Sequence, residues 1–233
     1  MAVKTLFFDL DHTLWDFEAN SEKALSQLFE EFELLERIRS FRTFHTEYKK
    51  INAESWHQYS RGTITKAVLR TRRFAQTFQK FGFRDDALVE KMATGYTAIS
   101  PYNTALFPNA LETLESLKQQ GYAMHIITNG FKEVQFIKLE QSGLINYFDV
   151  VLCSEEVGKN KPARIVFDHA LSLANAKSEE SVMIGDSYQA DVVGAENAGI
   201  QAILFDPGFD HEDKKHKWII RDLKAIPETL VWM

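Results

Sequence analysis

The chain has 233 residues, of which 45% are apolar and 26% charged, and this composition excludes a disordered protein. The length suits one large domain or a core domain with an insertion, and the formal net charge of −6 argues against a nucleic acid polymer as partner. We expect no signal peptide, because the apolar run within residues 1–8 is short and Asp9 follows it at once. We expect no membrane partner, because no apolar stretch approaches the roughly 20 residues that span a bilayer.

The first predicted element is a buried strand over residues 3–8, which leads into the carboxylates of Asp9 and Asp11. If the strand continues to Asp9, the alternation of side chains places both carboxylates on the same side of the backbone. They would then lie at the carboxyl end of a strand, where open α/β sheets bind their ligands. Two carboxylates so close repel each other unless a cation or a base lies between them. The pair therefore predicts a divalent metal site.

The next stretch, up to about residue 100, has apolar residues at the helical period and no convincing strand. The expected helices span residues 20–32, 40–57, 63–80 and 85–99. Asn20 or Ser21 is available as the N-cap of the first helix and Thr63 as that of the third. Pro101 disfavours helical geometry in the residue before it and marks a boundary. The pattern predicts an α-helical bundle inserted directly after the carboxylate pair.

From Leu106 onward, strands and helices alternate. The expected strands span residues 122–128, 149–153, 181–185 and 201–205, and the expected helices span 108–120, 131–142, 162–174 and 188–198. This alternation predicts an α/β fold with a doubly wound parallel sheet and helices on both faces. Residues 206–217 are polar and predict a solvated loop.

The first strand belongs to the same sheet, so the sequence predicts two domains. Residues 1–15 and 104–233 form the α/β core, and residues 16–103 form a helical cap. The single cysteine, Cys153, excludes an internal disulfide and predicts a small buried residue within a strand. It also fits the reducing cytosol, so we expect a cytoplasmic protein.

Polar residues of different types follow the predicted strands: Thr128, Asn129, Lys161, Asp186 and Asp191. Each has an ordinary alternative, since Asn129 suits a turn, Lys161 a surface position and Asp191 the first turn of a helix. Strand ends in a doubly wound sheet converge on one crevice. Together these residues therefore favour a functional site.

The chain resembles the haloacid-dehalogenase superfamily of phosphotransferases over its full length. The matching motifs are Asp9-Leu10-Asp11-His12-Thr13-Leu14, Thr128-Asn129-Gly130, Lys161-Pro162, and Gly185-Asp186-Ser187 with Asp191. The helical insertion resembles the cap carried by one branch of this family. Within that branch, Ile127–Phe131, Ser154–Gly158 and the stretch from Trp56 to Gly62 are similar to nucleotidases that act on noncanonical pyrimidine nucleotides.

The resemblance implies a Mg²⁺-dependent phosphomonoester hydrolase that forms an aspartyl-phosphate. The implied substrate is a small phosphorylated molecule, above all a nucleoside monophosphate cleaved by 5′-nucleotidase activity. A phosphosugar phosphatase and a mutase similar to β-phosphoglucomutase are the alternatives. The mutase returns the phosphoryl group to a sugar instead of releasing phosphate.

The resemblance also implies a role for each matching residue. Asp9 is the nucleophile and Asp11 the general acid and base. Thr128, with Asn129 and Gly130, binds a phosphoryl oxygen, and Lys161 supplies a fixed positive charge. Mg²⁺ is held by Asp9, the backbone carbonyl of Asp11, and Asp186. Asp191 supports these groups and does not bind the ion directly.

Four further residues leave alternatives open. His12 stands where many relatives have glycine, and it either touches the substrate or is a packed, non-catalytic histidine. Trp56 and Arg61 suit stacking on a base and bonding to its edges, whereas helical spacing also suits the bundle core. Lys159 lies close to Lys161 and competes for the role of motif lysine.

Overall fold

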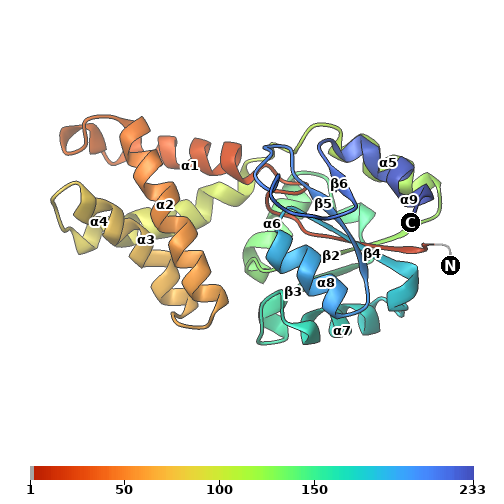
Figure 1. The fold of residues 1–233 in the computed structure, drawn as a ribbon. Coiled ribbons are helices and arrows are strands. Elements are labelled where there is room, and N and C mark those ends of the chain that lie inside the picture. The colour runs from red at the N-terminus through yellow and green to blue at the C-terminus, as the bar shows by residue number, and fades with distance from the viewer. Residues whose placement is uncertain (1–2) are drawn as a thin grey trace. The chain divides into compact units, whose positions relative to one another are not determined.

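The computed structural model describes residues 3–233 and separates into two compact units. One unit combines the chain up to Phe17 with Thr104–Met233, and the other is Glu18–Asn103. Figure 1 shows that the strands gather in the first unit and that the second consists of helices. Within residues 3–233, none of the helices combines the length and the apolar character that crossing a membrane requires.

The first unit is built on a six-stranded sheet in the order β3-β2-β1-β4-β5-β6, and all neighbouring strands are parallel. The strands are β1 (Thr5–Phe8), β2 (Ala123–Thr128), β3 (Val150–Cys153), β4 (Ser181–Gly185), β5 (Gln201–Phe205) and β6 (Ile219–Ile220). The predicted doubly wound parallel sheet is thus confirmed. The short edge strand β6 was not predicted, because two apolar residues after a polar loop carry no periodic signal.

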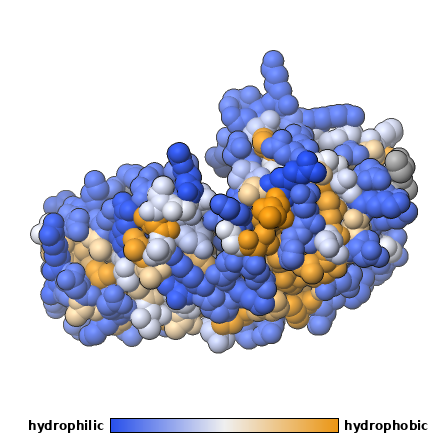
Figure 2. Space-filling view, turned by 90° about the horizontal axis from the view of Figure 1, so that it is seen from below, coloured by the Kyte–Doolittle hydropathy of each residue, from blue (hydrophilic) through white to orange (hydrophobic). Residues whose placement is uncertain are grey.

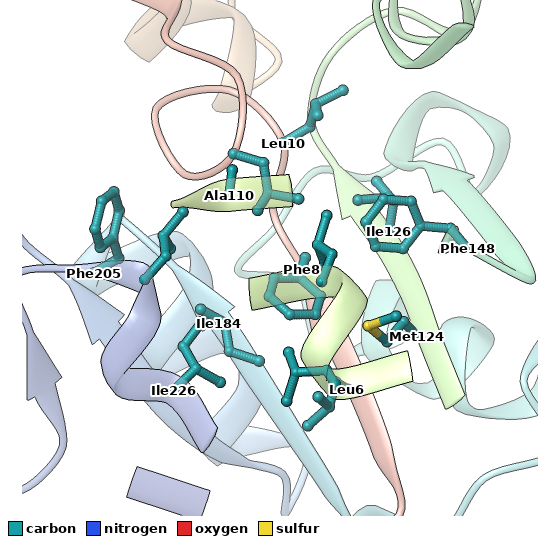
Figure 3. Packing of buried hydrophobic residues seen from close by; sticks show 14 of the residues in the cluster. Leu6, Phe8, Leu10, Ala110, Met124, Ile126, Phe148, Ile184, Phe205 and Ile226 are labelled. Carbon is teal, nitrogen blue, oxygen red and sulfur yellow. The ribbon is translucent and has the colours of Figure 1, made fainter. Parts of the chain in front are cut away.

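Helices cover both faces of this sheet (Figure 1). They are α5 (Ala110–Gln119), α6 (Lys132–Gln141), α7 (Arg164–Leu173), α8 (Gly194–Asn197) and α9 (Ile226–Val231). Side chains alternate along β1, so Leu6 and Phe8 pack towards α5 and α9 and Phe7 packs towards α7 and α8. Figure 3 shows Leu6, Phe8 and Ile184 converging with Ile226 on the first of these faces. This packing on both faces leaves the strand ends as the place for polar chemistry.

Two of the predicted helices in the sheet unit differ from those observed through a backbone feature that periodicity does not reveal. The helix expected over residues 162–174 begins at Arg164, after a cis peptide bond between Lys161 and Pro162. The helix expected over residues 188–198 is a π-helix, Tyr188–Val193, followed by the short α8. A periodicity of 3.6 residues does not distinguish this π-helix from an α-helix over so few residues.

The second unit contains α1 (Phe17–Glu31, of which Phe17 lies in the first unit), α2 (Phe41–Ser60), α3 (Lys66–Lys80) and α4 (Asp86–Ile99). Asn20 and Ser21 do not cap the first helix, because α1 begins earlier and both residues are buried within it. The Ser21 hydroxyl accepts a hydrogen bond from Tyr96 at 2.8 Å. Thr65, not Thr63, caps α3 by accepting from the backbone N–H of Val68.

Most of the surface is polar, with scattered apolar positions. Figure 2 shows one face, where apolar surface gathers on the unit that holds the sheet. Helix α7 contributes exposed apolar side chains in this unit, among them Ile165 and Leu173.

Candidate active site

Lys161 lies at the centre of a buried polar cluster at the carboxyl ends of β1 and β2. Its ammonium group donates to Asp9 Oδ1 at 2.7 Å, to the Ile127 carbonyl at 2.6 Å and to Asp191 Oδ1 at 2.6 Å. The side chain is 2% exposed, whereas Lys159 is exposed to solvent. An ammonium has three donors, so these contacts use its full capacity. The geometry distinguishes Lys161 from Lys159 as the residue placed beside Asp9.

Asp9 follows β1 directly, and its backbone N–H still donates to the Ile184 carbonyl of β4 at 2.9 Å. Burial raises the pKa of the Asp9 carboxyl to about 7, against the opposing effect of the Lys161 charge. Burial also raises the pKa of Asp186 well above its usual range, and the nearby charges of Asp9 and Asp191 raise it further. The pKa of Lys161 is raised in turn, because Asp191 and Asp9 outweigh the effect of burial. One buried cation thus faces three carboxylates.

This excess of carboxylates fits a hard divalent cation. One oxygen atom from each of Asp9, Asp186 and Asp191 lies within 4.8 Å of the others. Carboxylate oxygens are the ligands that Mg²⁺ prefers, and a bound cation would offset the mutual repulsion of these three carboxylates. The residues present therefore fit a magnesium ion.

Asp191 differs from the other two carboxylates because hydrogen-bond donors already hold both of its oxygens. Lys161 donates to Oδ1, and the backbone N–H of Ser187 donates to Oδ2 at 3.0 Å. Its position requires a glycine nearby, since a Cβ atom at Gly185 would lie 2.3 Å from the Asp191 carboxyl carbon. The arrangement suits Asp191 for holding Lys161 in place.

Asp11 has two buried partners that the sequence analysis missed. Lys138 donates to Asp11 Oδ1 at 2.5 Å, and Gln135 donates to Oδ2 at 2.8 Å. Burial alone would raise the pKa of Asp11, but the charge of Lys138 and these hydrogen bonds lower it below the usual value. Both partners come from α6, where their three-residue spacing puts two polar residues on the helix face that also buries Leu139. That polar interruption of an apolar face was the available signal.

The Thr128-Asn129-Gly130 turn connects these contacts. The Thr128 hydroxyl accepts from the Gly130 N–H at 3.0 Å and from Gln135 at 3.1 Å. The Asn129 side chain bonds to both the backbone N–H and the carbonyl of Lys161, at 2.8 and 3.1 Å. Asn129 therefore fixes the loop that carries the buried lysine, a contact that the sequence did not reveal.

His12 and Thr13 lie in the turn after Asp11. His12 has a φ of 64°, in the left-handed region that glycine adopts most easily. Its ring lies 4.7 Å from that of Phe17. The Thr13 hydroxyl donates to Asp186 Oδ1 at 3.3 Å, so a residue with no predicted role contacts a candidate metal ligand.

Trp56 and Arg61 belong to the helical unit and lie at the end of α2. Trp56 is half-buried, and its ring lies 5.7 Å from that of Tyr59 in an edge-on arrangement. Arg61 is exposed at the C-cap of the helix. The residues brought together around Asp9 all come from the unit that holds the sheet.

The parallel sheet and the site at its carboxyl edge define an α/β enzyme built around carboxylates and two buried lysines. The family model described as haloacid dehalogenase-like hydrolase matches residues 6–205. The chain belongs to this family of hydrolases.

Two curated relatives and one solved structure resemble most of the chain. The pyrimidine 5′-nucleotidase PynA of Streptococcus pneumoniae is 34% identical over 208 residues, covering 89% of this chain and 85% of that protein. The pyrimidine 5′-nucleotidase YjjG of Escherichia coli is 32% identical over 200 residues, covering 84% of this chain and 82% of that protein. The HAD-hydrolase YfnB of Bacillus subtilis, whose crystal structure is bound to magnesium, has a TM-score of 0.89 at 27% identity and covers 99% of this chain and 100% of its own.

Proposed function

We propose that the protein is a Mg²⁺-dependent phosphomonoesterase that forms an aspartyl-phosphate and acts as a 5′-nucleotidase on pyrimidine nucleoside monophosphates. The observation that carries the chemistry is Asp9, a buried carboxylate held at 2.7 Å by Lys161 and flanked by Asp186. The nucleotide preference rests on the similarity to PynA and YjjG.

In the proposed first step, an Asp9 oxygen forms a bond to phosphorus while the ester P–O bond breaks. Asp11 gives a proton to the departing oxygen, which leaves as the alcohol. The incoming phosphate brings negative charge beside Asp11 and so favours the protonated form that this transfer needs. Lys161 balances the charge on Asp9 and the phosphoryl group.

In the second step, water attacks phosphorus and Asp11 takes its proton, which releases phosphate and restores the Asp9 carboxylate. Thr128, with Asn129 and Gly130, would bind a phosphoryl oxygen. Mg²⁺, held by Asp9, Asp186 and the carbonyl of Asp11, would supply positive charge to the phosphoryl oxygens. Asp191 would act by keeping Lys161 in position.

The base and sugar must be recognised outside this common chemistry. Within the unit that holds the sheet, the proposed contact is His12, in the turn after Asp11. Within the helical unit, Trp56 and Arg61 have the residue types that suit a base. A ring and a guanidinium group together can stack on a base and bond to its edge.

A phosphate-release assay on the purified full chain tests the proposal. The panel contains pyrimidine and purine nucleoside monophosphates, sugar phosphates and p-nitrophenyl phosphate, each with Mg²⁺ or with a chelator. We expect pyrimidine nucleotides to be preferred and the chelator to abolish release. A strong preference for sugar phosphates would refute the nucleotidase assignment, and interconversion of sugar phosphate isomers without phosphate release would identify a mutase.

Two carboxylate variants make the test specific to the nucleophile. Asp9→Asn should abolish turnover, whereas Asp168→Asn, which changes an exposed carboxylate on α7, should leave it unchanged. Full turnover by Asp9→Asn would refute the role of Asp9.

A further inference from the structure

The Lys138 ammonium group is buried against an aromatic wall next to Asp11. The side chain is 4% exposed, and its Nζ lies 4.1 Å from the centre of the Trp15 ring and 5.7 Å from that of Phe17. Removing an ammonium from water is costly unless a partner compensates. The partner here is Asp11 Oδ1 at 2.5 Å.

Trp15 reaches this place because the chain folds back after the Asp11 turn. Its backbone N–H donates to the Leu10 carbonyl at 2.9 Å, and its carbonyl accepts from the His12 N–H at 3.0 Å. The ring is fully buried. The wall that holds Lys138 is therefore built by the same turn that carries Asp11.

The Asp11 carboxylate is restrained at both oxygens. Lys138 holds Oδ1 and Gln135 holds Oδ2, and the same Gln135 amide lies 3.1 Å from the Thr128 hydroxyl. Rotation of the carboxylate would break one of these contacts. Each oxygen accepts more than one hydrogen bond, so both restraints leave room for a proton donor or acceptor from the substrate.

We propose that Lys138 is a positioning residue for proton transfer by Asp11, with Gln135 as the second restraint. This inference rests on the proposed function, in which Asp11 protonates the departing oxygen. Proton transfer needs an Asp11 carboxylate oxygen and the departing oxygen of the substrate to lie within hydrogen-bond reach and to be correctly oriented. The contacts from α6 orient Asp11 relative to Thr128, the proposed phosphoryl-binding residue.

The dependence on the leaving group separates this role from a general structural one. A nucleoside monophosphate releases an alcohol that needs a proton, whereas p-nitrophenyl phosphate releases a stable phenolate that does not. The ratio kcat/KM reports steps up to the transfer of the phosphoryl group and not the later attack by water. Lys138→Met keeps a long apolar side chain against Trp15 and removes the charge.

We expect Lys138→Met to lower kcat/KM for a pyrimidine nucleoside monophosphate about 100-fold and for p-nitrophenyl phosphate less than about 5-fold, because general acid catalysis contributes about 10² or more. Lys138→Arg should recover most of the loss, since it restores a charged donor. Lys118→Met is the matched control, because Lys118 also lies over a ring, that of Tyr147, but on the exposed surface. The kcat/KM values of Lys118→Met for both substrates should equal those of the wild type.

An equal loss on both substrates, or no loss on either, would overturn the positioning role. If Lys138→Met does not fold, Gln135→Leu tests the second restraint, and the same selective loss on the nucleotide is expected. A wild-type protein that hydrolyses neither substrate would refute the proposed function itself, and the inference would fall with it.

Discussion

Gly130→Ala tests how the Thr128-Asn129-Gly130 turn is coupled to α6. A Cβ atom at position 130 would lie 1.5 Å from Gln135 Nε2 and 2.9 Å from its Cγ, so the Gln135 side chain must move. Gly130 does not adopt a left-handed conformation, so alanine meets no backbone penalty there. The whole effect should arise from the displaced glutamine.

The magnitude follows from the two hydrogen bonds that Gln135 loses. The bond to the ionised Asp11 is worth about 1.5–3 kcal/mol and the bond to the Thr128 hydroxyl about 0.5–1.5 kcal/mol. Replacing glycine with alanine returns about 0.4–1 kcal/mol by restricting the unfolded chain. We therefore expect Gly130→Ala to lower the free energy of unfolding by about 1–4 kcal/mol.

A double-mutant cycle in urea unfolding checks this reasoning. In a Gln135→Ala background the clash and both hydrogen bonds are already gone, so Gly130→Ala should no longer destabilise the protein and should raise the free energy of unfolding by about 0.4–1 kcal/mol through its effect on the unfolded chain. Phosphate release should follow the same pattern, with no further loss from the second substitution. Equal destabilisation in both backgrounds would refute the reasoning, because it would mean that a group other than Gln135 opposes the added methyl.

Three other predictions concern buried ionisable groups. Lys161→Met should lower the free energy of unfolding by about 3–5 kcal/mol and abolish turnover, because it leaves Asp9 and Asp191 buried without a cation; unchanged thermal unfolding would contradict this. Mg²⁺ at about 100 times its dissociation constant should add about 2.7 kcal/mol to the stability of the wild type. Asp186→Asn should lose most of that gain in a thermal-shift titration, and a full gain in this variant would exclude Asp186 as a ligand. Burial lowers the pKa of His125 below 6.5, and neither of its ring nitrogens has a hydrogen-bond partner among residues 3–233. The unfolded chain therefore takes up a proton at higher pH than the native state, and stability falls as pH drops below about 6.5, by at most about 1.4 kcal/mol per pH unit. His125→Leu should flatten this acid limb in urea unfolding at pH 7 to 5, and identical slopes for both proteins would refute the assignment.

The local pattern of the sequence determined the class of fold. Alternating apolar runs and amphipathic helices can satisfy their hydrogen bonds and bury their apolar sides only as a layered parallel sheet. The observed β4 and β5 have the predicted bounds, because continuous apolar runs between turn residues define them. Asp9, Asp186 and Lys161 could be selected because strand ends in such a sheet meet at one edge.

Only the tertiary structure decided which polar groups touch. Lys159 and Lys161 are the same residue type, two positions apart. The fold distinguishes them, because it buries Lys161 against Asp9 and leaves Lys159 exposed. Ser21 had the residue type of a cap but serves as a buried acceptor for Tyr96, a residue distant in sequence. Such pairings depend on side chains that approach through space, which local periodicity does not encode.

Asp11 illustrates the same division most clearly. The sequence identified its carboxylate from its two-residue spacing to Asp9, a distance set by the strand itself. Its partners, Lys138 and Gln135, lie more than 120 residues further along the chain and meet it only because β2 pairs with β1 and α6 packs on the sheet. Local backbone geometry thus indicated the carboxylates of the candidate site, and long-range packing decided which groups hold and charge them.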